Sequence, residues 1–445
     1  QIISYPAGKL EKEFVIPSSV TTIKVEAFYR CEHLENVKIP ESITSIEYGA
    51  FYRCENLRSI EIPESVKSIG NEIISDYTII YTKADSEAHK YAEENKKAYI
   101  LDGDATDIST DYEIKAEETW DISKNGDGSV IGKWTLSDKT LRISGNGKMK
   151  NWNSNDTNDW HEKKYTYVIE NVIIEDKITN IGEDAFYNCS ELTNVTIPDS
   201  ATFIGDKAFW RCSSLTNITI PDNVVDIGRY VFFECRSLTS VTMSNNIISI
   251  GEEAFRECIN LINIKIPNSI TSIEDRLFCG CSSLVNIKIP NSVKKIGQDV
   301  FGGCSGLTNI EISNNITSIG RGMFSGCINL KNVTIPDSAT FIGDEAFYGC
   351  SSLTNITIPD SVTSIGYDAF YKCNELKQIE ISSNVRNIEN TSFLGCNNLQ
   401  EIKVNVNNKY YLDENGILYN KDKTKIMCYP AGKLENEFKI PNSVI

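Results

Sequence analysis

Apolar and polar residues recur along this chain with a period of 23 residues. The stretch LTNITIPDSVTSIGYDAFYKC, residues 353–373, contains the pattern once. From Leu353 to Ile358 apolar and polar side chains alternate, as they do in a half-buried strand. Pro359 ends this segment, because proline has no backbone N–H to donate to a sheet. The pattern therefore predicts a short strand in every period.

The second half of the period predicts a bend followed by a short helical segment. Val362 and Ile365 are apolar, and Gly366 suits a backbone turn. Phe370 and Cys373 are three residues apart, which is a helical or 3₁₀ spacing. None of these elements can bury its apolar side alone, so successive coils must stack. We therefore expect an α/β repeat solenoid whose parallel strands lie about 4.8 Å apart.

Three positions keep this register through twelve copies of the repeat. A Phe stands three residues before each ladder cysteine, and a Leu stands three residues after it. We expect all three side chains to form one continuous core. The ladder cysteines are Cys31, Cys54, Cys189, Cys212, Cys235, Cys258, Cys281, Cys304, Cys327, Cys350, Cys373 and Cys396.

The repeat pattern is interrupted twice, which predicts two arrays with caps. Residues 85–97 read as a capping helix, with Asp85 or Ser86 as its N-cap. A second interruption, after Val404, reads as a hairpin with a turn at 414–416, after which the repeat strand resumes at Phe438 and Ile440. The predicted organisation is the end of a first array at 1–101 with its cap at 71–101, an acidic linker at 102–117, a β-hairpin cap at 118–168, a second array at 169–404, and a hairpin insertion with a truncated repeat at 405–445.

The two ends of the chain resemble each other. Tyr5–Val20 reads YPAGKLEKEFVIPSSV, and Tyr429–Val444 reads YPAGKLENEFKIPNSV. We therefore expect a piece of a longer protein, with both ends inside the repeat pattern. The first residues show no signal peptide.

The repeat quoted above resembles the Treponema pallidum-type leucine-rich repeats of BspA-like bacterial surface proteins. Ser244, Ser313 and Ser382 depart from that pattern by replacing the proline, and Glu274 and Glu389 by replacing the glycine. The resemblance implies right-handed leucine-rich-repeat arrays at the cell surface or outside the cell. It also implies adhesion to host or microbial proteins, with glycans as a second ligand class.

Composition and charge narrow the range of partners. The 445 residues are 40% hydrophobic and 24% charged, which is typical of a folded protein. The net charge of −17 repels nucleic acid and anionic lipid. No run of eighteen apolar residues occurs, so we expect no membrane insertion of this piece.

The fourteen cysteines raise the question of redox or metal chemistry. Twelve belong to the ladder, where Cys serves as a small apolar residue, and we expect buried free thiols. Cys279 and Cys428 fall outside it, and their role stays open. The sequence FCGC, residues 278–281, is neither a redox C-x-x-C motif nor half of a zinc site.

No catalytic motif accompanies His33, His89 or His161. We expect no enzyme activity, no catalytic residues, no cofactor and no metal. The acidic linker contains a partial match to a calcium-binding loop. Its positions 1, 3, 5, 9 and 12 are Asp102, Asp104, Thr106, Thr110 and Glu113. Asp107 replaces its essential glycine, so an acidic linker is the preferred interpretation.

Two columns of outward strand residues form the candidate ligand face. They either satisfy one another as solvated Asn and Thr ladders or present a polar surface to a protein or glycan. Charged residues interrupt the columns at mid-array, where we look for specificity. The candidate residues are Asn194, Thr196, Asn217, Thr219, Asn263, Lys265, Asn286, Lys288, Asn309 and Glu311.

A candidate aromatic contact strip follows the ladder Phe residues. Tyr187, Trp210 and Phe233 occupy the next position in three successive coils. They are either outer core or an exposed strip for a partner or for self-association. The sequence thus favours a non-enzymatic recognition module, with a structural spacer or an intracellular interaction scaffold as alternatives.

Overall fold

The computed structural model describes residues 1–76, 78–101, 114–152, 160, 165–435 and 437–445. The chain divides into two compact units, which are described separately here. Unit 1 comprises Gln1–Trp120, Lys133–Leu141 and Ser154–Ile169, and unit 2 comprises Asp121–Gly132, Arg142–Asn153 and Glu170–Ile445.

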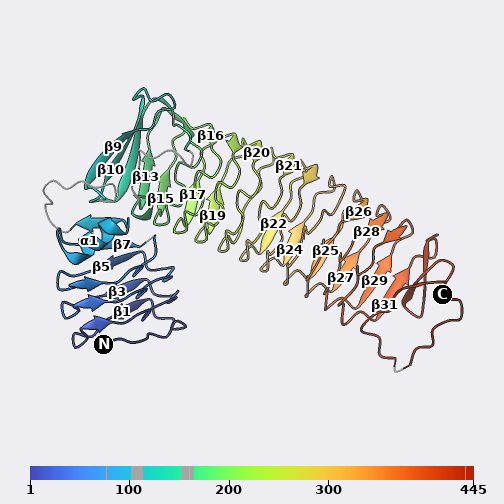
Figure 1. Cartoon of the computed structure of the whole chain (residues 1–445). Coiled ribbons are helices and arrows are strands. Elements are labelled where there is room, and N and C mark those ends of the chain that lie inside the picture. Colours follow the sequence, from blue (N-terminus) through green and yellow to red (C-terminus); the bar gives the residue numbers. More distant parts are fainter. Residues whose placement is uncertain (77, 102–113, 153–159, 161–164, 436) are drawn as a thin grey trace. The chain divides into compact units, whose positions relative to one another are not determined.

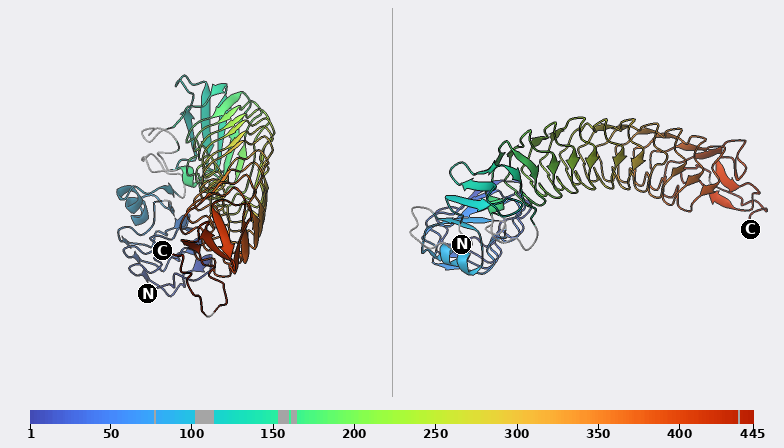
Figure 2. Two further views of the ribbon diagram at one scale, coloured as in Figure 1. Left: turned by 90° about the vertical axis from the view of Figure 1, so that its right-hand side faces the viewer. Right: turned by 90° about the horizontal axis from the view of Figure 1, so that it is seen from above.

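Most coils of unit 2 contain two short strands (Figure 1). In one coil these are β27 (Asn355–Thr357), as predicted, and β28 (Ser364–Ile365), which is too short to show an alternating pattern. Both pair in parallel with the same positions 23 residues earlier, in β25 (Asn332–Thr334) and β26 (Phe341–Ile342). The coils therefore stack one behind another, as the right-hand view of Figure 2 shows.

The two strand positions form two ladders along unit 2. The first is divided into short sheets, with β13 and β15, β17 and β19, β22 and β24, β25 and β27, and β29 and β31 as its pairs. Its further strands are β13 (Asn171–Ile174), β15 (Asn194–Thr196), β17 (Asn217–Thr219), β19 (Ser240–Thr242), β22 (Asn286–Lys288), β24 (Asn309–Glu311), β29 (Gln378–Ile381) and β31 (Glu401–Val404). The second ladder adds β12 (Gly147–Lys148), β14 (Ile178–Ile181), β16 (Phe203–Ile204), β18 (Asp226–Ile227), β20 (Ser249–Ile250), β21 (Ser272–Ile273), β23 (Lys295–Ile296) and β30 (Asn387–Ile388).

The helical segment predicted in each coil is wrong. Residues 367–372 form turns, and Asp368 and Lys372 adopt left-handed φ angles of 53° and 58°. A right-handed helix cannot continue through such residues. The N–H groups of Phe370 and Lys372 instead donate across to the next coil, to the carbonyls of Ser392 (2.8 Å) and Leu394 (3.0 Å). The coil is therefore that of a β-solenoid rather than an α/β solenoid.

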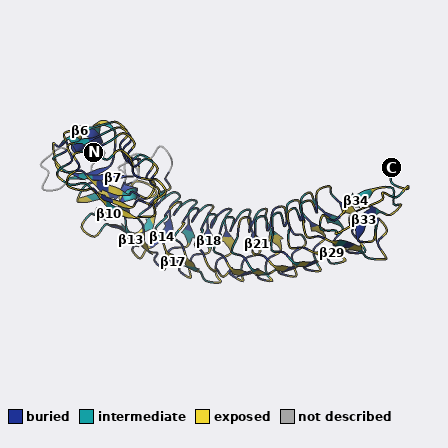
Figure 3. Ribbon diagram, turned by 90° about the horizontal axis from the view of Figure 1, so that it is seen from below, coloured by how far each residue is buried: buried dark blue, intermediate teal, exposed yellow. Residues whose placement is uncertain are grey.

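The core lies inside the coils, where the ladder Phe, Cys and Leu side chains are buried, as predicted (Figure 3). From Phe186 to Phe393 the ladder rings stack in order, with centroids 5.3–5.8 Å apart and planes inclined by 3–21°. Such offset stacks add attraction beyond the buried area. Every coil therefore rests on the same apolar contacts as its neighbours.

Unit 1 contains coils of the same kind. Its sheets have the orders β1-β3, β2-β4-β6 and β5-β7-β8. The predicted helix is present as α1 (Glu87–Glu94), with Ser86 as its N-cap. The role of residues 71–101 as an end cap stays a prediction. The strands are β1 (Glu13–Val15), β2 (Thr22–Ile23), β3 (Asn36–Lys38), β4 (Ser45–Ile46), β5 (Ser59–Glu61), β6 (Ser68–Ile69), β7 (Ile79–Thr82) and β8 (Tyr99–Leu101).

The predicted N-terminal hairpin is present as β10 (Val130–Thr135) and β11 (Thr140–Gly145), beside β9 (Glu117–Asp121). The division between the units runs through these strands. They belong to a sheet with the order β15-β13-β11-β10-β9. A 3₁₀ helix, η1 (Tyr165–Tyr167), follows. The assignment of residues 118–168 as a cap stays a prediction.

The C-terminal hairpin is also present, as β32 (Tyr411–Glu414) and β33 (Ile417–Asn420), with a third strand β34 (Ile426–Cys428). Asn415 and Gly416 have positive φ angles, as the predicted tight turn requires. The predicted return of the repeat strand at Phe438 and Ile440 is wrong, since residues 437–440 form no strand. The hairpin occupies the edge of the ladder, because Ile402 N–H donates to the Gly416 carbonyl at 2.9 Å.

No helix in the described ranges is long and apolar enough to cross a membrane.

Candidate functional site

The ladder cysteines are free buried thiols, as predicted. Each thiol in unit 2 from Cys212 onward donates to the carbonyl of the ladder Phe in the coil before it. Cys281 Sγ, for example, lies 3.1 Å from the Phe255 carbonyl oxygen. Burial raises the pKa of Cys350 to about 12 and raises those of Cys235 and Cys304 as well. These groups are therefore structural thiols and poor nucleophiles at neutral pH.

The two cysteines outside the ladder are half-buried free thiols. Burial raises the pKa of Cys428 to about 12 and also raises that of Cys279. Within the described ranges, no group of three or more His, Cys, Asp or Glu side chains could hold a metal ion. The calcium-loop residues Asp102, Asp104, Thr106, Thr110 and Glu113, and His161, lie outside those ranges.

Residues of the candidate ligand face lie at the first strand position of each coil, including Asn263 and Lys265, where no strand forms. Register in the paired strands aligns equivalent positions, such as Asn217 with Ser240 and Lys288 with Glu311. All ten candidate residues are exposed. They are Asn194, Thr196, Asn217, Thr219, Asn263, Lys265, Asn286, Lys288, Asn309 and Glu311.

The Asn side chains partly satisfy one another along the columns. Asn309 Nδ2 donates to Asn286 Oδ1 at 3.3 Å, and Asn194 Nδ2 donates to Asn171 Oδ1 at 2.9 Å. Several also bond to the Thr that precedes them, as Asn355 does to Thr354 at 3.2 Å. The column is thus an ordered polar surface that still faces solvent.

Two of the three mid-array charges neutralise each other. Lys288 Nζ lies 2.6 Å from Glu311 Oε2, and the two side chains are 74% and 71% exposed. Such an exposed pair adds little stability. Lys265 makes no ion pair with any described residue, so it is the mid-array charge that stays open to a partner.

Sequence reasoning missed two aliphatic side chains beside these lysines. Ile262 is 50% exposed and Val285 is 38% exposed. Thr or Lys holds the same position in the other coils from Thr193 to Lys377, and that contrast was the available signal. Residues 261–267 also form no strand, so the ladder is interrupted beneath this patch.

The candidate aromatic strip is stacked and only partly accessible. Tyr187 and Trp210 ring centroids lie 5.8 Å apart, and those of Trp210 and Phe233 lie 4.3 Å apart. Tyr187 and Trp210 are half-buried, whereas Phe233 is buried at 8% exposure beneath the Arg256 guanidinium. Tyr230 joins the cluster, 5.5 Å from Trp210. A contact role for the strip stays a prediction.

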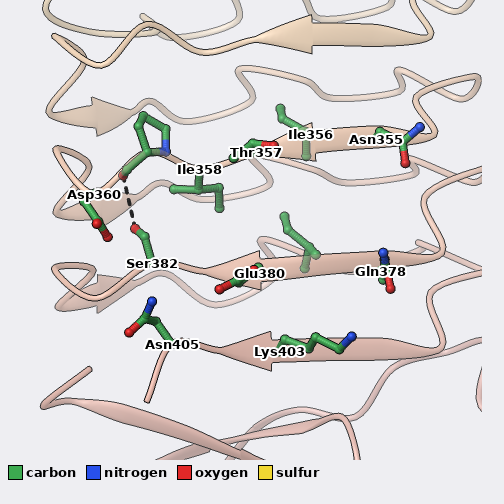
Figure 4. A pocket seen from close by; sticks show the side chains of 12 residues that line it. Asn355, Ile356, Thr357, Ile358, Asp360, Gln378, Glu380, Ser382, Lys403 and Asn405 are labelled. Atoms are coloured by element: carbon green, nitrogen blue, oxygen red, sulfur yellow. Dashed lines mark hydrogen bonds between the residues drawn. The ribbon is translucent and has the colours of Figure 1, made fainter. Parts of the chain in front are cut away.

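A hollow of about 470 Å³ opens on the strand face near the C-terminal hairpin. Figure 4 shows Thr357, Glu380 and Lys403 along three successive strands, with Asp360, Ser382 and Asn405 past the strand ends. Its polar lining suits hydrogen bonding to a partner more than burial of an apolar ligand.

Of the described histidines, His33 is exposed and His89 is buried in α1, where its Nδ1 accepts from Asp85 N–H at 3.0 Å.

Comparison with known proteins gives one family. A family model described as BspA type leucine rich repeat region matches residues 7–93, 164–284, 225–345 and 317–416. A comparison with functionally curated proteins gave no match.

Several solved structures are similar to this chain. A leucine-rich repeat protein from Bacteroides ovatus is 24% identical over 88% of this chain and 84% of its own, with a TM-score of 0.45. A leucine rich cell surface protein from Faecalibacterium prausnitzii is 23% identical over 89% and 88%, with a TM-score of 0.34. The T. pallidum leucine rich repeat protein is 26% identical over 40% and 87%, with a TM-score of 0.31.

Proposed function

Because this chain belongs to the BspA-type leucine-rich repeat family, we propose that it is a non-enzymatic protein-binding module of a bacterial surface or secreted protein. The observation that carries the proposal is the strand face of unit 2. Its candidate residues are all exposed and repeat in register from coil to coil. A long ordered polar face suits recognition of a macromolecule rather than conversion of a small substrate.

The size of this face supports binding of a protein. The first ladder runs from β13 to β31, and eleven coil positions about 4.8 Å apart extend for about 48 Å. A typical interface needs about 800 Å² on each partner, which a face of this length can supply. The interruption of the polar columns by Lys265, Ile262 and Val285 gives one region a distinct chemistry.

The proposed partners are extracellular host or microbial proteins, with glycans as a second ligand class and self-association through the aromatic strip as a further mode. The family resemblance supports a location at the cell surface or outside the cell and a role in adhesion. The net charge of −17 disfavours nucleic acid.

The test compares capture of extracellular-matrix and plasma proteins by the chain and by two triple variants. One variant carries Lys265→Ala, Lys288→Ala and Glu311→Ala. The control carries Lys294→Ala, Lys295→Ala and Glu274→Ala, which removes the same charges from exposed positions on the second ladder. We expect saturable capture that only the first variant loses.

Equal loss in both variants would contradict the assignment of specificity to the mid-array face. Capture by none of the three proteins would favour the alternative in which the stacked coils serve as a spacer for another domain.

A further inference from the structure

The hollow near the C-terminal hairpin has a counterpart in unit 1. The hollow in unit 2, about 470 Å³, lies over β27, β29 and β31. That in unit 1, about 820 Å³, lies over β3, β5, β7 and β8. Each is found on the last strands of a first-position ladder, so the two hollows have the same place within their own units.

Equivalent coil positions line both hollows. The first strand contributes an Asn, the residue after the strand-ending proline is an acid, and the next strand contributes a Glu. The equivalent pairs are Asn355 and Asn36, Asp360 and Glu41, and Glu380 and Glu61. The same arrangement of groups therefore occurs twice in chain segments of different sequence.

The carboxylates in these hollows are exposed and largely uncompensated. Glu380 and Glu61 are exposed and make no ion pair with any described residue. Asp360 is exposed and accepts through Oδ1, from Ser383 N–H at 3.1 Å and Ser383 Oγ at 2.8 Å, whereas its Oδ2 accepts no hydrogen bond from a described residue. In the unit 2 hollow the lysine beside them, Lys403, already has Glu401 as a partner at 3.4 Å. In the unit 1 hollow the carboxylates of Glu41, Glu61 and Glu64 outnumber the lining lysines Lys38 and Lys83, and Lys83 already has Glu64 as a partner at 3.6 Å. A cationic group is therefore the charge that these hollows accept.

The remaining lining suits a peptide chain. Asn355 and Gln378 offer amide donors and acceptors beside the carboxylates, and these match the groups of a peptide backbone. Three strands about 4.8 Å apart span about 10 Å, which is the length of about three extended residues. A lysine or arginine of such a segment would supply several N–H donors to the carboxylates.

We propose that each hollow binds an extended segment of a partner protein, with a basic side chain received by Asp360 and Glu380 in unit 2 and by Glu41 and Glu61 in unit 1. The proposal rests on the proposed protein-binding function and names the chemistry of the partner. It predicts two binding sites in each chain, which operate independently of the mid-array patch.

The test uses three labelled hexapeptides in which serine alternates with lysine, glutamate or glutamine. Binding to the whole chain is measured by calorimetry at low and at physiological salt. The variants are Asp360→Asn with Glu380→Gln, Glu41→Gln with Glu61→Gln, and all four changes together. The control, Asp222→Asn with Asp337→Asn, removes two charges from exposed positions that also follow a strand-ending proline but lie outside the hollow.

We expect the lysine peptide alone to bind, with two sites per chain. Each double variant should weaken its own site about fivefold or more, which lowers the apparent stoichiometry toward one, and the fourfold variant should weaken both. Thermal unfolding should be unchanged, because all four side chains are exposed.

Equal weakening by the control would show general charge attraction and would overturn the proposal. Failure of the lysine peptide to bind, or equal binding of the glutamate peptide, would also overturn it. The protein-capture experiment separates the two ideas: capture that persists without peptide binding leaves the proposed function in place and removes only this ligand.

Discussion

The contacts that a residue makes with the neighbouring coil largely determine its side chain and its backbone conformation. A cysteine at the ladder position fits a small buried space, and its thiol reaches the Phe carbonyl of the preceding coil, as Cys304 Sγ reaches that of Phe278 at 3.1 Å. The residue before the ladder cysteine has a positive, left-handed φ angle in all twelve coils, whether it is a glycine such as Gly326 (73°) or a larger residue such as Arg211 (57°). Position in the coil therefore dictates backbone conformation even where the residue is not glycine.

The buried thiols predict a loss of stability at alkaline pH. Burial raises their pKa values above the value of about 8.5 in the unfolded chain, so the unfolded chain ionises first. The stabilisation that these protonated thiols provide is therefore fully present below about pH 8.5. Above that pH the free energy of unfolding decreases, by up to about 1.4 kcal/mol per pH unit for each thiol. Urea unfolding midpoints measured between pH 7.5 and 10 should therefore decrease steeply.

A variant with Cys235→Ser, Cys304→Ser and Cys350→Ser provides the control. Serine does not ionise in this range, so the midpoint should decrease less steeply with pH than in the unmodified chain. An unchanged slope would mean that other groups, such as the tyrosines, cause the alkaline loss.

At the scale of elements, one buried side chain makes four of the hydrogen bonds that attach the C-terminal hairpin to the solenoid. Asn408, 1% exposed, donates from Nδ2 to the carbonyls of Ser382 (2.8 Å) and Val385 (2.9 Å). Its Oδ1 accepts from the N–H groups of Tyr410 and Tyr411 at 2.8 and 2.9 Å. The four bonds connect the end of the ladder to the start of the hairpin.

Replacing Asn408 with Ala should therefore release the hairpin. The change removes the partners of four backbone groups, and a buried unsatisfied group costs about 1–3 kcal/mol. Hydrogen exchange should show faster exchange across β32 and β33 while β27 keeps its protection. Asn407→Ala, at an exposed neighbouring position, should leave exchange unchanged. Retained protection of the hairpin in Asn408→Ala would show that its other contacts, such as the bond from Ile402 N–H to the Gly416 carbonyl, are enough to hold it.

On the scale of the whole molecule, most contacts in unit 2 join a coil to its direct neighbours. Strand partners are 23 residues apart, and the ladder Phe rings stack only with the next ring on either side. Stability in such an array is a sum of coil and interface contributions. Removing one coil should thus preserve all remaining kinds of contact.

Excision of residues 305–327 tests this expectation, because it joins Cys304 to Ile328 and keeps the repeat in register. The shortened chain should retain its circular dichroism spectrum and a cooperative thermal transition. Excision of residues 305–326 shifts every later position by one, which turns apolar strand residues outward. That control should lose the transition, and equal behaviour of the two variants would contradict a strict register.

The sequence was sufficient for the period, the first strand and the buried Phe, Cys and Leu ladder, because these depend on apolar spacing. It was insufficient for the turn segment in coil 353–373, because the left-handed residues Asp368 and Lys372 are not glycine. Glycine at the position of Lys372 in five other coils was the available signal. Exposure of the candidate ligand face was predicted from strand alternation. The two hollows were not, because a hollow depends on side chains from three coils and on where the ladder ends.

During synthesis, folding of the coils competes with disulfide formation among the ladder thiols. In the folded chain the ladder thiols are buried, so oxidants in the solvent do not reach them, and most lie against a backbone carbonyl, as Cys281 does against that of Phe255. Unfolded, the same chain carries fourteen thiols that an oxidising compartment can join in wrong pairs. If the protein works outside the cell, its coils must close faster than disulfides form, and local contacts 23 residues apart are suited to that speed.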